Sequence, residues 1–265
     1  MEQIWDILKR LRPETTQPPQ TILPAGERRR LFVAKVEEYR KKYQPEFTCA
    51  HCEDKGVVNL RRPDNSVDYA ATVPCRHCIS PEKLRQYLGV SSLDATFSNF
   101  KPVKGAEKAL AAAQDLCSLA TTWKLLLLYG TWVDWKTHLM ESISLDLWSK
   151  GISARVLTFP AFIGSLKNTF DKKELEGQSF DELINSVCVR PYLLLDDVGS
   201  ADSFTSWSLS QLEKIMLARY RDNLLTVITT NMDYKKLPGF LVSRFSDAEK
   251  GRIVFNSAPD YRPKK

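Results

Sequence analysis

The chain has 265 residues, of which 43% are hydrophobic and 26% are charged, so it can bury one large core and a smaller module. No apolar run approaches the roughly 20 residues that span a bilayer, and the N-terminal residues lack the continuous apolar core of a signal peptide. We therefore expect a cytoplasmic protein without a membrane partner. The net charge of +6 is compatible with a polyanionic partner but does not identify one.

The N-terminal region, residues 1–45, reads as helices joined by a linker. Residues 1–11 place apolar side chains at helical spacing, and residues 12–26 contain four prolines, which are typical of an extended linker. Residues 27–43 predict a second helix with an apolar and aromatic stripe between basic residues. That stripe either packs against the cysteine-rich segment that follows or forms a surface for a partner.

Residues 46–90 contain two Cys-x-x-Cys pairs separated by 22 residues, and the intervening segment is long enough for a β-hairpin. In a cytoplasmic chain this spacing predicts a tetrahedral zinc site rather than disulfides. The expected ligands are Cys49, Cys52, Cys75 and Cys78. Four thiolates leave no open position for a catalytic water, so the zinc is expected to be structural.

The third region, residues 91–265, alternates apolar strands with amphipathic helices after a polar stretch that ends at Gly105. This alternation predicts an α/β fold in which helices cover both faces of a parallel sheet. The expected strands are 124–130, 153–159, 192–198 and 224–231. The expected helices are 106–122, 137–151, 160–171, 180–187 and 208–222.

Small or polar residues follow three of the predicted strands, at Gly130, at the pair Asp196 and Asp197, and at Asn231. In an open α/β sheet, ligands bind outside the carboxyl ends of the strands. Acids at the end of an apolar strand have the layout of a Walker B motif, although strand-end aspartates also cap turns. Thirteen residues after Asn231, Arg244 lies in a short polar turn.

These features converge in a resemblance to bacterial replicative-helicase loaders of the DnaC/DnaI type, which are AAA+ ATPases. The segments that carry it are LDATFSNFKPVKG, SLKNTFD, YLLLDDVGSADSFTSW, TTN, VSRFSD and GRIVFNSAPDYR, and it covers about residues 45–262. The resemblance implies an AAA+ P-loop core preceded by the zinc module, and we expect no separate lid domain. It also implies partners: a DnaB-type hexameric helicase, bound by the N-terminal part, and single-stranded DNA.

The resemblance assigns the phosphate and magnesium side of a nucleotide site to residues near Gly130. Gly130 opens the Walker A loop, and Lys136 would contact the β- and γ-phosphates of ATP or ADP. Thr137 would ligate Mg²⁺, with Asp196 behind it.

The resemblance also assigns the hydrolytic side of the site. Asp197 would prepare the attacking water, and Asn231 would sense the γ-phosphate. Arg244 would reach the nucleotide of a neighbouring subunit, which implies a homo-oligomer.

The loop departs from the family pattern G-x-x-G-x-G-K-T, because Val133 and Trp135 replace its second and third glycines. Such a loop binds phosphate through inward-turned backbone N–H groups, whose angles and close approach to the ligand require glycine. We therefore expect nucleotide binding to be impaired and ATPase activity to be doubtful. The alternative is a rebuilt loop that admits nucleotide in another pose. Natural loss of the glycines and a laboratory change to the loop fit the sequence equally.

Three functions compete on this evidence. The first is a helicase-loader-like protein in replication initiation, and the second is a non-hydrolysing AAA+ scaffold or adaptor. The third is a transposition helper ATPase that resembles the IstB type, which shares the core. The zinc module favours the first over the third, because IstB-type chains usually lack it.

Overall fold

The computed structural model describes residues 24–42, 47–61, 66–101, 104–130, 135–171, 179–200 and 204–256. The chain divides into two compact units, residues 1–48 and 49–265, and each is described by itself. The helix predicted over residues 1–11 lies outside the described residues, as does most of the predicted linker. The division into three regions stays a prediction.

The first unit contains helix α2 (Ala25–Lys42), which begins two residues before the predicted helix. The carbonyl of Pro24 accepts a hydrogen bond from the backbone N–H of Glu27 at 2.9 Å, which closes the first turn. Apolar side chains of this helix, Leu31 and Phe32 among them, are about half exposed.

The second unit begins with an antiparallel hairpin of β1 (Val57–Arg61) and β2 (Val67–Pro74), as the spacing of the cysteine pairs predicts. The backbone N–H of Cys75 donates to the carbonyl of Gly56 at 2.8 Å and closes the open end of the hairpin. Both cysteine pairs therefore lie at this end, one before the first strand and one after the second.

Helix α3 (Pro81–Leu88) follows the hairpin and was not predicted. Ser80 caps its N-terminus, and Gly89 ends it in a left-handed conformation with φ of 70°. A side chain at Gly89 would meet the carbonyl oxygen of Val156 at 2.2 Å, so this position requires glycine. Leu88 is fully buried, and α3 thereby joins the cysteine-rich hairpin to the large core.

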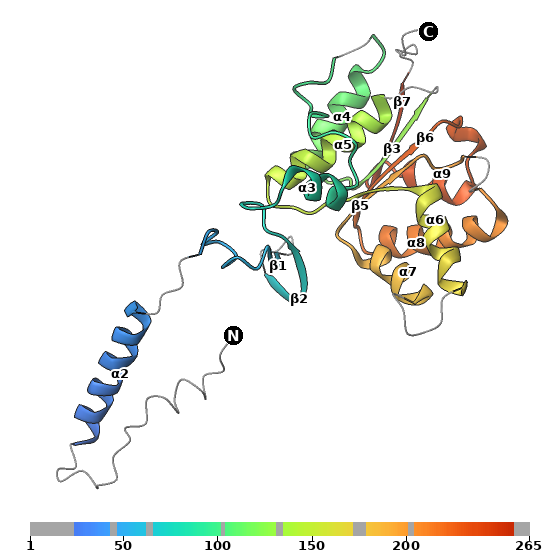
Figure 1. Ribbon diagram of the computed structural model, residues 1–265. Helices are drawn as coiled ribbons and strands as arrows, with labels where there is room; N and C mark the ends of the chain where they lie inside the picture. The colour runs from blue at the N-terminus through green and yellow to red at the C-terminus, as the bar shows by residue number, and fades with distance from the viewer. Residues whose placement is uncertain are drawn as a thin grey trace. The chain divides into compact units, whose positions relative to one another are not determined.

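The large core is built on a five-stranded parallel sheet in the order β4-β5-β6-β3-β7 (Figure 1), which confirms the predicted α/β fold. The strands are β3 (Leu125–Gly130), β4 (Val156–Thr158), β5 (Tyr192–Asp196), β6 (Leu225–Thr230) and β7 (Gly251–Asn256). Every residue of β6 is buried, as expected for a central strand covered on both faces.

Helices cover both faces of this sheet (Figure 1). They are α4 (Glu107–Cys117), α5 (Trp135–Ser149), α6 (Phe159–Asp171), α7 (Phe180–Val189), α8 (Ser206–Arg221) and α9 (Gly239–Phe245), with a 3-10 turn, η2 (Tyr234–Lys236). Leu126 and Leu128 pack with α4 and α5, whereas Leu125 and Leu127 pack with α6 to α9. Within the described ranges, no helix has both the length and the apolar character needed to cross a bilayer.

Several boundaries differ from the prediction. Helix α4 ends at Cys117 rather than at residue 122, because Leu119 adopts a left-handed conformation with φ of 61°. Arg244 lies in helix α9, whereas a short polar turn was expected there. Helix α5 begins at Trp135 rather than Thr137, because the indole is buried in the core and counts toward the apolar face of the helix. Phe159 begins α6 rather than ending a strand, and β4 is only three residues long.

A buried arginine ties three elements together on the α7–α8 side of the sheet. Arg219 of α8 is fully buried, and its guanidinium donates to the carbonyls of Val187, Arg190 and Leu225 and to the hydroxyl of Thr226 at 2.6–2.8 Å. Burial lowers the pKa of Arg219 to about 9, so the side chain is still charged at neutral pH. Its hydrogen bonds fix the C-terminal end of α7 against the start of β6.

Candidate functional site

Four of the predicted site residues lie at the carboxyl edge of the sheet. Gly130 ends β3, Asp196 ends β5 with Asp197 directly after it, and Asn231 directly follows β6. Strand β6 lies between the other two strands, so the three strand ends are neighbours. The structure thus brings together residues that are up to 101 positions apart in the sequence (130 to 231).

Asp196 is buried and receives two hydroxyl hydrogen bonds. Thr137, in the first turn of α5, donates to one carboxylate oxygen at 3.1 Å. Thr229 of β6 donates to the other carboxylate oxygen. Helix α5 therefore places the hydroxyl of Thr137 against the acid that ends β5, which is the arrangement in which a magnesium ligand and its supporting acid would meet.

Asp197 has an unusual backbone conformation, with φ of 58°, which Asp tolerates better than most residues. Its backbone N–H donates to the hydroxyl of Thr229, and the side-chain amide of Asn231 donates to its carboxylate, both at 3.0 Å. Burial raises the pKa of Asp197, and the neighbouring Asp196 raises it further, whereas Lys136 and Asn231 lower it.

Thr229 is the functional residue that the sequence analysis missed. Its hydroxyl contacts both acids, because it donates to Asp196 and accepts from the backbone of Asp197. It is 1% exposed. One feature of the sequence could have indicated this role. Thr229 and Thr230 form a polar pair at the end of a mostly apolar strand, directly before Asn231.

Lys136 lies under the indole of Trp135 at the start of α5. Its side chain is 4% exposed, and its ammonium donates to the carbonyl of Gly130 at 3.2 Å and lies 5.2 Å from the centre of the indole. Trp135 is 7% exposed and packs in the α4–α5 core, where its indole N–H has no hydrogen-bond partner among the described residues. Val133 lies outside the described residues.

The segment that joins α3 to α4 is held along α5. The buried carboxylate of Glu141 accepts a hydrogen bond from the backbone N–H of Ser91 at 2.8 Å. The hydroxyl of Ser142 donates to the carbonyl of Ala95 at 2.8 Å. The segment that resembles the one preceding the nucleotide site of helicase loaders therefore lies beside the helix that follows the Walker A loop.

Arg244 of α9 does not reach the crevice of its own chain. Its guanidinium donates to the carbonyl of Phe240 at 2.7 Å and lies 5.9 Å from the ring centres of Tyr220 and Phe240. Its backbone adjoins Gly251, which pairs with Leu125 at the amino ends of the strands. The side chain is thus at the opposite end of the sheet from Gly130.

The four cysteines of the two pairs form one cluster. The sulfurs of Cys49 and Cys75 are 3.8 Å apart, those of Cys52 and Cys78 are 3.6 Å apart, and all four lie within 4.8 Å of one another. Four sulfurs at about 2.3 Å from a tetrahedral zinc would be about 3.8 Å apart. The cluster therefore fits a metal such as zinc.

Without a cation, the thiols of the cluster differ in how readily they ionise. The backbone N–H of Cys52 lowers the pKa of Cys49 to about 7, whereas hydrogen bonding to Cys52 raises the pKa of Cys78 to about 12. A cation among the sulfurs would favour the thiolate form of each. His51 and His77 are exposed, with ring centres 4.3 Å apart, and neither belongs to the group of possible ligands, which consists of the four sulfurs.

The strand order, the helices on both faces and the acids at the strand ends define an AAA+ P-loop fold. No protein-family model matches the chain. The chain is 32% identical over 126 residues to the replicative helicase loader DnaI of Bacillus subtilis (strain 168). That match covers 48% of this chain and 35% of DnaI, so it spans about a third of the length of that relative.

Solved structures agree on the fold. A crystal structure of DnaI superposes with a TM-score of 0.51 at 22% identity, covering 62% of this chain and 92% of that one. The DnaC helicase loader gives 0.50 at 21% identity, covering 62% and 97%. AMPPCP-bound DnaA from Aquifex aeolicus gives 0.52 at 20% identity, covering 62% and 50%. With the DnaI sequence match, these similarities support the resemblance to loaders of the DnaC/DnaI type.

Proposed function

We propose that this chain is a helicase-loader-like AAA+ protein that binds a DnaB-type hexameric helicase and single-stranded DNA during replication initiation in the cytoplasm. The observation that carries the proposal is a cysteine cluster joined through α3 to an AAA+ sheet, in a chain that is similar to the helicase loader DnaI. A structure of DnaA bound to single-stranded DNA among the neighbours supports the DNA partner.

The cysteine cluster holds a structural zinc in this proposal. Cys49, Cys52, Cys75 and Cys78 are the ligands, and their sulfur separations support this assignment. The metal supplies no chemistry beyond cross-linking the two ends of the hairpin. The surface that the zinc holds together belongs to the part of the chain that contacts the helicase.

The crevice at the carboxyl edge is a nucleotide site in which ATP binding is impaired. Lys136 would hold the phosphates, and Thr137 and Asp196 would hold Mg²⁺ if nucleotide bound. Two contacts support the impairment: the Lys136 ammonium donates to Gly130, and the indole of Trp135 lies over it. Val133 adds a β-branched side chain in a loop that depends on glycine.

The remaining site residues keep the roles that the resemblance implies. Asp197, held by Asn231, would prepare the attacking water, and Asn231 would sense the γ-phosphate. Arg244 would act on the nucleotide of a neighbouring copy, which agrees with its position at the other end of the sheet. A homo-oligomer is therefore part of the proposal.

Capture by an immobilised DnaB-type hexameric helicase tests the loader function. We expect retention of the full zinc-loaded chain, and loss of retention for Cys75→Ser. Cys188→Ser is the matched control, because Cys188 lies outside the cluster. Failure of the wild-type chain to bind the helicase would overturn the loader proposal and favour the transposition helper as the second candidate.

Nucleotide titration tests the impaired crevice. With a fluorescent ATP analogue and Mg²⁺, we expect no binding at micromolar concentration and no ATP turnover with or without single-stranded DNA. This outcome makes the chain a non-hydrolysing loader or scaffold. Micromolar affinity would instead show that the altered loop admits nucleotide, and it would remove Trp135 and Val133 as obstacles.

A further inference from the structure

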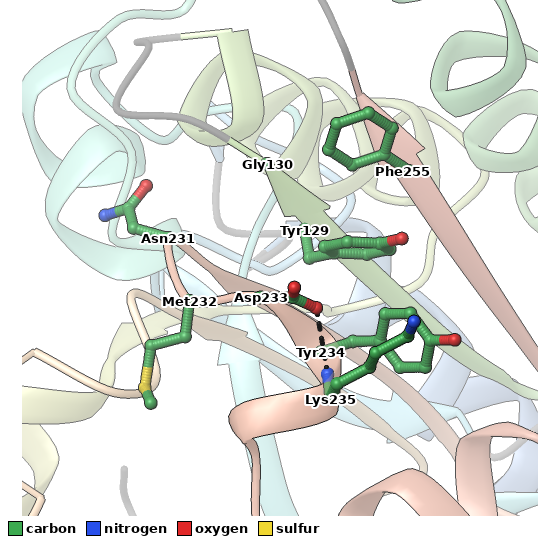
Figure 2. Close-up of a pocket in the computed structure, with 8 residues that line it drawn as sticks. All are labelled: Tyr129, Gly130, Asn231, Met232, Asp233, Tyr234, Lys235 and Phe255. Carbon is green, nitrogen blue, oxygen red and sulfur yellow. Dashed lines mark hydrogen bonds between the residues drawn. The ribbon is translucent and has the colours of Figure 1, made fainter.

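An open pocket of about 640 Å³, shown in Figure 2, lies at the carboxyl ends of β3, β6 and β7. It is separate from the cysteine cluster and does not include Asp196, and of its lining residues only Gly130 and Asn231 have a role in the proposed nucleotide site. The residues that line it are Tyr129, Gly130, Asn231, Met232, Asp233, Tyr234, Lys235 and Phe255.

Three aromatic rings from three different elements converge on this pocket (Figure 2). Tyr129 of β3 stands between the other two, with ring centres 5.0 Å from Tyr234 of η2 and 5.0 Å from Phe255 of β7. The rings are tilted at 60° and 41° rather than stacked flat. Phe255 is 50% exposed, so one of its surfaces is available to a planar ligand.

The pocket also carries a cation. Lys235 is exposed, and its ammonium has no ion-pair partner in the part of the chain that the structure describes. The nearby acid does not serve as one, because Asp233 accepts a hydrogen bond from the backbone N–H of Lys235 and caps η2. An aromatic surface with an adjacent free cation suits a planar ring that is attached to a phosphate.

The pocket is continuous with the crevice, because Gly130 and Asn231 line both. A ligand with a ring in the pocket would carry its phosphate toward the carboxyl edge of the sheet, near Gly130 and Asn231. Burial raises the pKa of Tyr129, with Tyr234 and Asp233 as smaller causes, so its hydroxyl stays a neutral hydrogen-bond donor at physiological pH.

We propose that this pocket binds a nucleobase against the aromatic surface that Tyr129, Tyr234 and Phe255 form, while Lys235 contacts the adjoining phosphate. The base comes either from single-stranded nucleic acid or from a mononucleotide. The inference deepens the proposed function, on which it rests, because it gives a loader-like chain a surface for bases. Every base presents an aromatic face, so we expect little sequence preference.

Equilibrium binding of the full zinc-loaded chain tests the proposal with two probes, a short fluorescein-labelled oligothymidylate and a fluorescent ADP analogue. Tyr234→Ala and Phe255→Ala should each weaken binding of one probe by about 5- to 100-fold, the range found when a stacking residue is truncated. Tyr234→Phe should retain the affinity. Tyr69→Ala is the matched control, because Tyr69 is 82% exposed on the hairpin, away from the pocket.

The probe that loses affinity identifies the source of the base. An abasic oligonucleotide of the same length should bind the wild type and the alanine variants alike, because it has no ring to stack. Lys235→Ala should weaken binding of the oligonucleotide and reduce its salt dependence by about one phosphate contact. If both alanine variants bind both probes as the wild type does, the proposal is wrong.

Capture by the helicase separates this failure from failure of the proposed function. The pocket variants should still be retained by an immobilised DnaB-type helicase, since the cysteine cluster is unchanged in them. Retained helicase binding with unaltered probe binding would overturn only the base pocket. Loss of helicase binding by the wild-type chain would overturn the loader function instead.

Discussion

The cysteine cluster and the nucleotide crevice differ in the groups that would bind the ligand. The cluster would use side chains alone, whereas the crevice would also use the backbone N–H groups of a loop. The cluster consists of four cysteine side chains, all present in the sequence. The structure places their sulfurs 3.6 to 3.8 Å apart in two pairs. The crevice keeps its acids, Thr137 and Asn231 in mutual contact, yet its phosphate loop has lost two glycines. In the proposed function, the metal site has all of its ligands, whereas the nucleotide site has its side chains but lacks two glycines of its loop.

Finding the expected residues in the sequence is therefore enough to identify a site that binds its ligand through side chains. It is not enough for a site that binds its ligand through backbone groups. A thiolate binds metal wherever its sulfur is placed correctly. A phosphate nest instead needs successive N–H groups to turn inward, which depends on residues that never touch the ligand through a side chain. This is the reason for the proposal that Val133 and Trp135 impair a site whose Lys136, Thr137 and Asp196 are all present.

The largest expected effect is at the cluster. Cys75→Ser should lower bound zinc from about one equivalent per chain to near none, because three thiolates close the tetrahedron poorly. Metal analysis by mass spectrometry measures the content, and limited proteolysis should then cut within the hairpin. Cys188→Ser should keep the zinc. A Cys75→Ser chain with full zinc content would show that the cluster is not the metal site.

The second prediction concerns the loop. Restoring glycine at both positions, Trp135→Gly with Val133→Gly, should tighten the binding of a fluorescent ATP analogue at least about tenfold, or about 1.4 kcal/mol. The same variant should melt at a lower temperature, because the indole is buried in the α4–α5 core and its removal leaves a cavity. A folded revertant that binds no better than wild type would place the defect elsewhere in the crevice.

A third test separates the intact half of the crevice from the altered loop. Thr229→Val removes the hydroxyl that serves both acids, leaves the backbone N–H of Asp197 without its partner and should cost about 1–3 kcal/mol. Thermal denaturation should show the loss as a drop of about 2–10 °C, whereas Thr229→Ser should melt close to wild type. Equal melting of the valine and serine variants would contradict this.

The smallest effect is expected at Asp197. Burial raises the pKa of its carboxyl, so the wild-type fold loses stability as pH rises from the ordinary carboxyl pKa of about 3.9 through the raised value. Asp197→Asn removes that loss and should raise the melting temperature by about 1–2 °C at neutral pH. Melting curves across pH should show this advantage vanishing in acid. An advantage that is constant with pH would rule out titration of Asp197 as its cause.

Burial explains which elements of the fold the sequence could predict. The strands of the central sheet are continuous apolar runs, and β3, β5 and β6 were found within two residues of their ends. Helix α3 was missed because it is only eight residues long, its exposed positions are polar, and its apolar face consists of Leu84, Tyr87 and Leu88 alone. Its caps, Ser80 and Gly89, were the better signal.

The prediction of the site residues was limited in a similar way. Asp196, Asp197 and Asn231 were identified because each is polar directly after an apolar run. Thr229 was not, because a threonine inside a strand is also an ordinary β-forming residue, and only the structure shows its hydroxyl between the two acids. The position of Arg244 at the far end of the sheet depends on the path of β7, which no local pattern specifies.

The buried arginine that joins α7 to β6 has a consequence for which positions of α7 can change in sequence. Three of the four groups that Arg219 contacts are main-chain carbonyls, which every amino acid carries alike. The hydrogen bonds of the joint therefore do not depend on the side chains of Val187, Arg190 and Leu225, and the packing of the core instead constrains the buried Val187 and Leu225. Exposed positions of α7, such as Asp181 and Asn185, can change without loosening this joint, because none of its hydrogen bonds uses their side chains.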